Sequence, residues 1–166
     1  MAKASEKSAT TAAGSVTASQ QSFRDDQRAW VGLENFSLTS FEQGKIVITV
    51  NVINSGKTPA QDLFSTNKMT VLPVRVSAAE PVMLPIEWAP GPALPPQGRY
   101  QVTLSAPGGI SIHYQNIKDG SKFLYLLGEL KYDDVYGQGR STKFCVTLTD
   151  PETKQLSFCN FFNGMN

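Results

Sequence analysis

The clearest structural signal in the chain is the stretch GKIVITVNVIN at residues 44–54. Because successive side chains of a strand point to opposite faces, its branched aliphatic residues at even positions share one face. These residues are Ile46, Ile48, Val50 and Val52. The alternation predicts a strand that covers a hydrophobic core with one face. The run is ended by Gly56, which tolerates a positive φ, and by Pro59, which has no N–H to donate.

Shorter strand-like stretches lie on both sides of this one. The first opens with RAWVGL at residues 28–33, where Trp30 is the expected core anchor. The others are expected at residues 61–67, 69–77, 99–104, 122–132, 140–149 and 155–161. Residues 81–96 hold six of the ten prolines and predict a loop over the core. Residues 107–119 predict one short helix, with Gly120 as its C-cap.

Seven or eight short strands with turns between them and little helix are typical of an all-β protein. The expected fold is an antiparallel, immunoglobulin-like β-sandwich, with a closed barrel as the alternative. Residues 27–166 are expected to form this domain. Residues 1–26 are expected to form a separate polar leader, rich in Ala, Ser and Thr, with no charged residue from 8 to 23.

The leader is expected to be either a flexible segment or a helical stalk, because it has little apolar area to offset the entropy of ordering. A stripe whose steps alternate between three and four residues supports the stalk. It consists of Ala9, Ala13, Val16, Gln20, Phe23, Gln27 and Trp30. Gly14 and the two Gln residues weaken it. No apolar segment follows the leader's Lys residues, so it is not interpreted as a signal peptide.

Composition excludes several classes of function. Fifteen Lys and Arg residues balance fourteen Asp and Glu residues, for a formal net charge of +1 at pH 7. Nucleic-acid-binding proteins usually gather positive charge on one face, so no nucleic-acid partner is expected. The sequence has no run of eighteen apolar residues, and no bilayer-spanning segment is expected in it. One His and two Cys are few ligands for a transition metal, and neither a metal nor a cofactor is expected.

Cys145 and Cys159 lie symmetrically around a turn centred on Glu152. In a hairpin with that centre they face each other with Cα atoms about 4.5–5.5 Å apart, a spacing that accepts a disulfide. The same register pairs apolar residues on the opposite face: Val146 with Phe158, and Leu148 with Leu156. The pattern favours a disulfide and an oxidising compartment, and the alternative is two free thiols in a cytosolic domain.

No catalytic constellation emerges from the sequence. His113 is the only His, and no GxSxG elbow or recognisable Cys nucleophile accompanies it. Asp133 and Asp134 are neighbours on an expected strand and point to opposite faces, so they do not make a pair of catalytic carboxylates. The segment YDDVYG at residues 132–137 lacks a calcium-loop pattern and is interpreted as a hairpin turn. The chain is therefore expected not to be an enzyme.

Two aromatic residues on expected loops are candidates for an interaction surface. Trp88 lies in the proline-rich segment and Tyr136 in the hairpin at residues 133–139. Aromatic anchors on loops often dominate recognition. The alternative for Trp88 is a structural role, in which its ring plugs one end of the sandwich.

Four segments occur in one order along the chain: RAWVGL at Arg28, NSGKTPA at Asn54, LYLLGELKYDDVYG at Leu124 and TKFC at Thr142. Together they resemble a widespread group of uncharacterised bacterial membrane-anchored proteins. The resemblance implies one or two transmembrane helices before the sequence, then an Ala-rich stalk and a β-rich soluble domain. Members commonly follow the second Cys with a His-Asn pair, but Phe162 stands where that His is expected. The resemblance therefore transfers no catalytic residue.

The expected function is that of a non-catalytic, membrane-tethered interaction domain whose partner is another protein. It would meet the membrane only through a segment absent from this chain. The expected location is the periplasmic or other extracytoplasmic face of a bacterial inner membrane, with the cytoplasmic side as the alternative. The alternative function is a soluble structural or assembly subunit that oligomerises through its aromatic and proline-rich loops.

Overall fold

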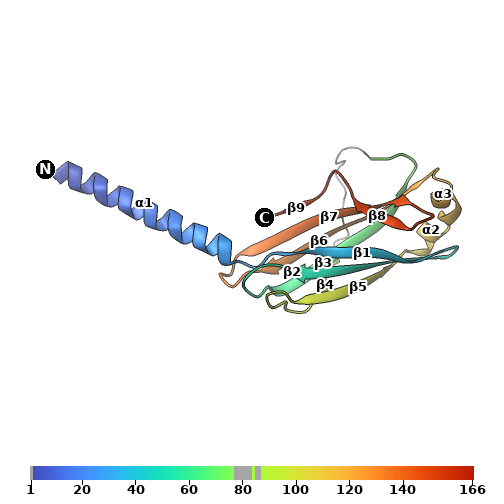
Figure 1. Ribbon diagram of the computed structural model, residues 1–166, viewed down its shortest axis with the longest axis horizontal. Helices are drawn as coiled ribbons and strands as arrows, with labels where there is room; N and C mark the ends of the chain where they lie inside the picture. The colour runs from blue at the N-terminus through green and yellow to red at the C-terminus, as the bar shows by residue number, and fades with distance from the viewer. Residues whose placement is uncertain (1, 77–83, 85–86) are drawn as a thin grey trace.

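A computed structural model of the chain describes residues 2–76, 84 and 87–166. Its elements follow in this order: α1 (Ala2–Gln27), β1 (Val31–Glu42), β2 (Lys45–Asn54), β3 (Gln61–Leu72), β4 (Ala89–Pro90), β5 (Arg99–Ser105), α2 (Gly108–Ser111), α3 (Tyr114–Lys118), β6 (Phe123–Asp133), β7 (Gly139–Asp150), β8 (Gln155–Phe158) and β9 (Gly164–Met165). The leader is thus a helix, and it projects from one end of the β-rich part (Figure 1).

The strands form two antiparallel sheets (Figure 1). The first has three strands in the order β1-β2-β5. The second has six, in the order β4-β3-β6-β7-β8 with β9 paired to β7. The described part of the chain is therefore mostly β and antiparallel, as the sequence predicts. Neither sheet closes on itself, so the barrel alternative is wrong.

One hydrophobic cluster draws residues from both sheets. The even-numbered row of β2 is buried as predicted, with no member more than 2% exposed: Ile46, Ile48, Val50 and Val52. The six-stranded sheet contributes a matching row from β6: Leu124, Leu126 and Leu130. Removing both rows from water supplies the main driving force that holds the sheets together.

The expected core anchor at the start of β1 is wrong. Trp30 is only half-buried, whereas its neighbours Ala29 and Val31 are fully buried. Trp30 instead lies under the guanidinium of Arg28, whose Cζ is 3.5 Å from the ring centroid. Because neighbours on an extended chain point to opposite sides, the burial of residues 29 and 31 directs the indole away from the core.

Two further segments differ from expectation. The strands expected at residues 61–67 and 69–77 are one continuous strand, β3, which pairs with β6. The single helix expected at residues 107–119 is two short helices, α2 and α3. Gly120 follows α3 with φ +77°, the conformation expected of a C-cap glycine.

The proline-rich stretch falls partly outside the described residues, which omit 81–83 and 85–86. Its described part includes β4, which pairs Ala89 with Ser65 and Pro90 with Phe64 at the edge of the six-stranded sheet. An edge is where a sheet accepts Pro, because that residue cannot donate a ladder hydrogen bond.

A second, smaller hydrophobic cluster lies on the other face of the six-stranded sheet. Its buried members are Tyr125, Leu127, Cys145 and Cys159. Val76 and Leu84 pack against it from the proline-rich side, and Phe161 packs against it from the C-terminal side. This face, which we call the outer face, therefore carries a covered apolar part around the cysteines.

Candidate functional site

The chain passes from α1 into β1 at residues 27–31, and we call the contacts around this point the junction. Asn54, the last residue of β2, is fully buried there. Its Oδ1 accepts hydrogen bonds from the backbone N–H groups of Trp30 (3.1 Å) and Gly56 (3.0 Å). Its Nδ2 donates to the carbonyl oxygens of Thr58 (2.8 Å) and Leu94 (3.0 Å). One amide therefore ties three separate chain segments together.

Gly56 is required at the junction by space and not by its φ, which is not positive. A Cβ at this position would collide with the backbone of Arg28, Ala29 and Trp30. The NSGKTPA segment therefore lies directly against the RAWVGL segment. The sequence-based reason given for this glycine, a turn with positive φ, is wrong.

Two hydroxyls from the six-stranded sheet also hold the junction. The Tyr132 hydroxyl accepts a hydrogen bond from the Val31 N–H (3.2 Å) and donates one to the Ala29 carbonyl (3.4 Å). The Thr142 hydroxyl donates to the Val31 carbonyl. All three bonds are buried, and they link the start of β1 in one sheet to β6 and β7 of the other. The four segments of the resemblance thus meet at this one place.

The turn between β6 and β7 is built on Asp134, which is only 1% exposed. Its Oδ1 accepts the backbone N–H groups of Tyr136 (2.9 Å) and Gln138 (3.1 Å), and its Oδ2 accepts Arg140 Nε (3.0 Å). Asp133 does not join this network and is half-buried. The two carboxylates are therefore separated, and Asp134 supports the turn that presents Tyr136.

The last turn of α1 is attached to the same end of the domain. Asp26 pairs with Lys57 Nζ at 2.6 Å, and this hydrogen bond lowers the pKa of the Asp26 carboxyl below its ordinary value. Arg24 lies over the Tyr136 ring, 5.5 Å from its centroid. Side chains 11–26 of the helix are all exposed. The helix is thus held at its end and stands free along its length (Figure 1).

The structure places the two predicted interaction residues in different settings. Trp88 is half-buried, and Lys131 Nζ lies 4.3 Å from its ring centroid on the outer face. Tyr136 is 36% exposed and contacts the helix through Arg24. They do not share a contact among the described residues. Their roles as interaction residues remain predictions.

The uncovered part of the outer face contains two adjoining hollows that sequence analysis did not find. The first, of about 410 Å³, is lined by residues that include Phe64, Lys131 and Ser141. The second, of about 310 Å³, is lined by residues that include Ser141, Lys143 and Phe162. They share Ser141 and Asn166. Side chains from β3, β6, β7 and the C-terminal segment meet here, an arrangement that no local sequence pattern encodes.

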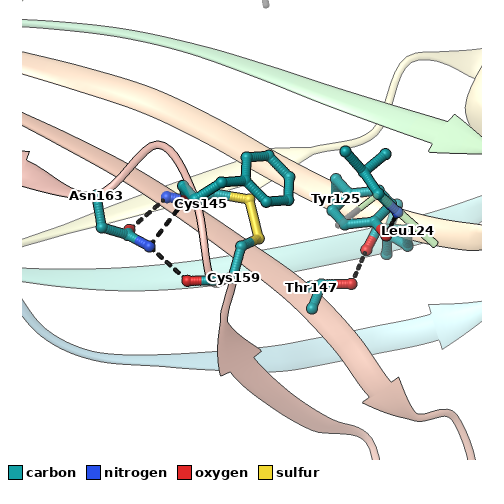
Figure 2. Close-up of a disulfide and its surroundings, with 8 residues drawn as sticks. Leu124, Tyr125, Cys145, Thr147, Cys159 and Asn163 are labelled. Atoms are coloured by element: carbon teal, nitrogen blue, oxygen red, sulfur yellow. Dashed lines mark hydrogen bonds between the residues drawn. A yellow bond between two sulfur atoms is a disulfide. The ribbon is translucent and has the colours of Figure 1, made fainter. Parts of the chain in front are cut away.

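Cys145 and Cys159 are joined by a disulfide between β7 and the segment after β8, with Cα atoms 5.3 Å apart. The strand register around them is the predicted one: Val146 pairs with Phe158, and Leu148 with Leu156. Figure 2 shows Asn163 beside the bond. Its Oδ1 accepts the Cys145 N–H (2.9 Å), and its Nδ2 donates to the Cys159 carbonyl (2.6 Å). No local sequence pattern predicted this role for Asn163.

No group of three or more His, Cys, Asp and Glu side chains suited to hold a metal occurs among residues 2–76, 84 and 87–166. His113 lies between α2 and α3, and its Nδ1 is 3.2 Å from Lys122 Nζ. Within the same described ranges, no helix is both long and apolar enough to cross a membrane.

Comparisons with known proteins give no family for the chain. No family model matches it. No curated protein matches it. Among solved structures, the chain is similar to Northeast Structural Genomics Consortium target SoR45, with 15% sequence identity and a TM-score of 0.43. That match covers 78% of this chain and 92% of the other.

Proposed function

We propose that the chain is a non-catalytic, membrane-tethered, extracytoplasmic interaction domain with an immunoglobulin-like β-sandwich. The observation that carries the proposal is the attachment of α1. The helix is bound at its last turn by Lys57, and its side chains from 11 to 26 are all exposed. A helix held in this way acts as a spacer between the domain and whatever precedes it.

The proposed spacer is long enough to lift the domain from a surface. Twenty-six residues of α-helix extend about 39 Å at a rise of 1.5 Å per residue. The proposed membrane segment is the one implied by the resemblance and is not part of this chain. The membrane-anchored group that the four segments resemble therefore remains the proposed family.

The proposed location follows from the disulfide. Disulfides persist in oxidising compartments and are rare in the cytosol, where thiols are kept reduced. The bond is buried, since Cys145 is 0% and Cys159 9% exposed. A disulfide in such a setting favours the periplasmic or another extracytoplasmic side of a bacterial inner membrane. The proposed partner, another protein, would bind the outer face near Trp88 or the turn at Tyr136.

The test is intact mass after alkylation, on protein taken directly from the cells that make it. We expect both cysteines of the denatured chain to resist alkylation until a reductant is added. A Cys159→Ser variant is the control, because its single thiol must alkylate without reductant. If both cysteines of the natural chain alkylate without reductant, the extracytoplasmic location is wrong and a cytoplasm-facing domain replaces it.

A second candidate function, the soluble assembly subunit, is favoured by one apolar hollow. It has a volume of about 300 Å³ and is lined by residues from both sheets, including Leu33, Phe144, Phe158 and Met165. Phe158 and Met165 are about half exposed. A subunit of this kind would form oligomers that a Phe158→Ser substitution dissociates. An oligomeric state unchanged by Phe158→Ser would contradict it.

A further inference from the structure

We infer that α1 pairs with the α1 of a second copy of this chain, in parallel and in register. The first observation is that neither its composition nor packing against the β domain stabilises this helix. It is 26 residues long and contains five Ser, three Thr and Gly14, all poorer helix formers than Ala. Isolated helices of this kind are marginal in water, because most helical stability in proteins comes from packing of one face. Side chains 11–26 have no such packing within one chain.

The exposed surface of α1 carries a narrow stripe of residues that a second helix could cover. Its positions alternate between steps of three and four residues: Ala13, Val16, Gln20, Phe23 and Gln27. This is the spacing of the seam in a coiled coil, where every first and fourth residue of a heptad faces the partner. Val16 is 56% and Phe23 63% exposed, so the largest apolar side chains of the helix lie on this seam. The seam is too narrow to be the buried face of a globular helix.

The distribution of charge favours a second copy of the chain as the partner that covers this stripe. No charged residue occurs from 8 to 23, so two identical helices meet without like-charge repulsion over this part of the seam. The charges of the last turn are engaged with the domain: Asp26 with Lys57, and Asp25 with Arg140 at 4.0 Å. Flanking charges are what coiled coils use to choose a different partner, and this stretch has none. A neutral stripe that matches itself fits a symmetric dimer.

A hollow beside Phe23 selects the parallel orientation. It has a volume of about 610 Å³ and is lined by Val16, Ser19, Gln20, Phe23, Arg24 and Tyr136. A parallel, in-register partner brings its own Phe23 to the level of this hollow. An antiparallel partner would bring the start of its helix, where the same spacing places Ala9 and the charged Glu6. The parallel arrangement also places Gln20 opposite Gln20, and a polar pair within the seam fixes register.

The pairing is independent of where the domain resides, so it does not rest on the proposed function. Anchoring two chains in one membrane would strengthen it by raising their effective concentration. The Tyr136 turn, predicted from sequence as an interaction site, would then form part of a contact between copies.

The experiment measures mass by sedimentation and helix content by far-UV circular dichroism over a range of protein concentrations. We expect the mass to rise from 18.1 kDa toward twice that value, and the helical signal to rise with it. Phe23→Asp should raise the dimer dissociation constant at least tenfold, because it places two carboxylates within the apolar seam. Ala18→Asp is the matched control, since it adds the same charge on the opposite side of the helix and should leave the dimer intact.

A cross-linking measurement fixes the orientation. Gln20→Cys should give a covalent dimer under mild oxidation, whereas Ala18→Cys should give little. Three results would overturn the inference. These are a chain that stays monomeric at every concentration, a dimer that withstands Phe23→Asp, and equal cross-linking at positions 18 and 20. Gln20 and Phe23 line the hollow beside Tyr136 but are not part of the hydrophobic core, so thermal unfolding of the β domain serves as the check that each variant is folded.

Discussion

Two asparagine side chains form similar hydrogen bonds with the backbone at two places in this molecule. Asn54 at the junction and Asn163 beside the disulfide each accept a backbone N–H with Oδ1 and donate to backbone carbonyls with Nδ2. Asn54 is fully buried, and its bonds to the Gly56 N–H and the Leu94 carbonyl are buried with it, whereas those to Trp30 and Thr58 are partly buried. Asn163 is exposed and stands next to a covalent bond that already holds the same two segments.

Burial is expected to decide how much such a side chain contributes to stability. A backbone group that loses its partner at an exposed position finds water instead. A buried group that loses its partner has none, and the cost is its full desolvation. The junction is therefore expected to lose more stability when its asparagine is removed than the disulfide site does when Asn163 is removed.

The largest effect is expected for Asn54→Ala. It leaves the buried Gly56 N–H and Leu94 carbonyl, and the partly buried Trp30 N–H and Thr58 carbonyl, without their side-chain partner, at a cost of about 4 kcal/mol in the free energy of unfolding. Chemical denaturation monitored by Trp fluorescence measures the loss. Asn51→Ala is the control, because Asn51 lies on the same strand with its amide bonded on the polar surface, and it should cost less than about 1 kcal/mol. Similar losses for the two variants would contradict the comparison.

Removal of the disulfide is expected to come second. Replacing Cys145 and Cys159 together by Ala opens a short loop of sequence separation 14 and should cost about 3 kcal/mol through the entropy of the unfolded chain. The denaturation midpoint, measured on the variant and on the natural chain with and without reductant, tests this. The reduced natural chain and the variant should agree within about 1 kcal/mol. No change on reduction would show that the bond does not constrain the domain.

Asn163→Ala is expected to have a modest effect of about 1 kcal/mol, because its two bonds to the cysteine backbone are only partly buried and the disulfide still joins the two segments. The substitution is more informative when it is combined with the variant in which both cysteines are Ala. If the disulfide makes Asn163 redundant, the substitution should cost more once the cysteines are Ala, and a double-mutant cycle measures the difference. Strict additivity would mean that the two restraints act independently.

The smallest effect concerns the exposed attachment of α1. The hydrogen bond from Lys57 lowers the pKa of Asp26, so the stabilisation is complete above the ordinary Asp pKa of the unfolded chain and is lost as the pH falls through the lowered value. An NMR titration of the Asp26 carboxyl should move to higher pH in Lys57→Ala. Lys45→Ala, which removes a Lys at the start of β2, should leave the titration where it is. An unchanged titration midpoint in Lys57→Ala would show that Lys57 does not bind Asp26 and does not hold the end of α1 at the junction.

Local patterns predicted the elements that depend on neighbours along the chain. The alternation in residues 44–54 predicted β2 and its buried row, and the symmetry of residues 145–159 predicted the register of the β7–β8 hairpin. The burial of Asn54 was present in the same pattern and was missed. It continues the row of positions 46, 48, 50 and 52 toward the core, so the alternation alone places its side chain inside.

A mostly β, antiparallel chain with a polar leader was predictable from local patterns, because period-two alternation and hairpin turns are encoded over a few residues. The contacts at the junction emerge only when the chain folds, because Tyr132 and Thr142 bind Val31 across 101 and 111 residues of chain. It also decided that Ala29 and Val31 are buried while Trp30 is not, and that two hollows open on the outer face. These outcomes depend on which distant segments pack together, and packing partners far apart in sequence leave no periodic signal in either segment.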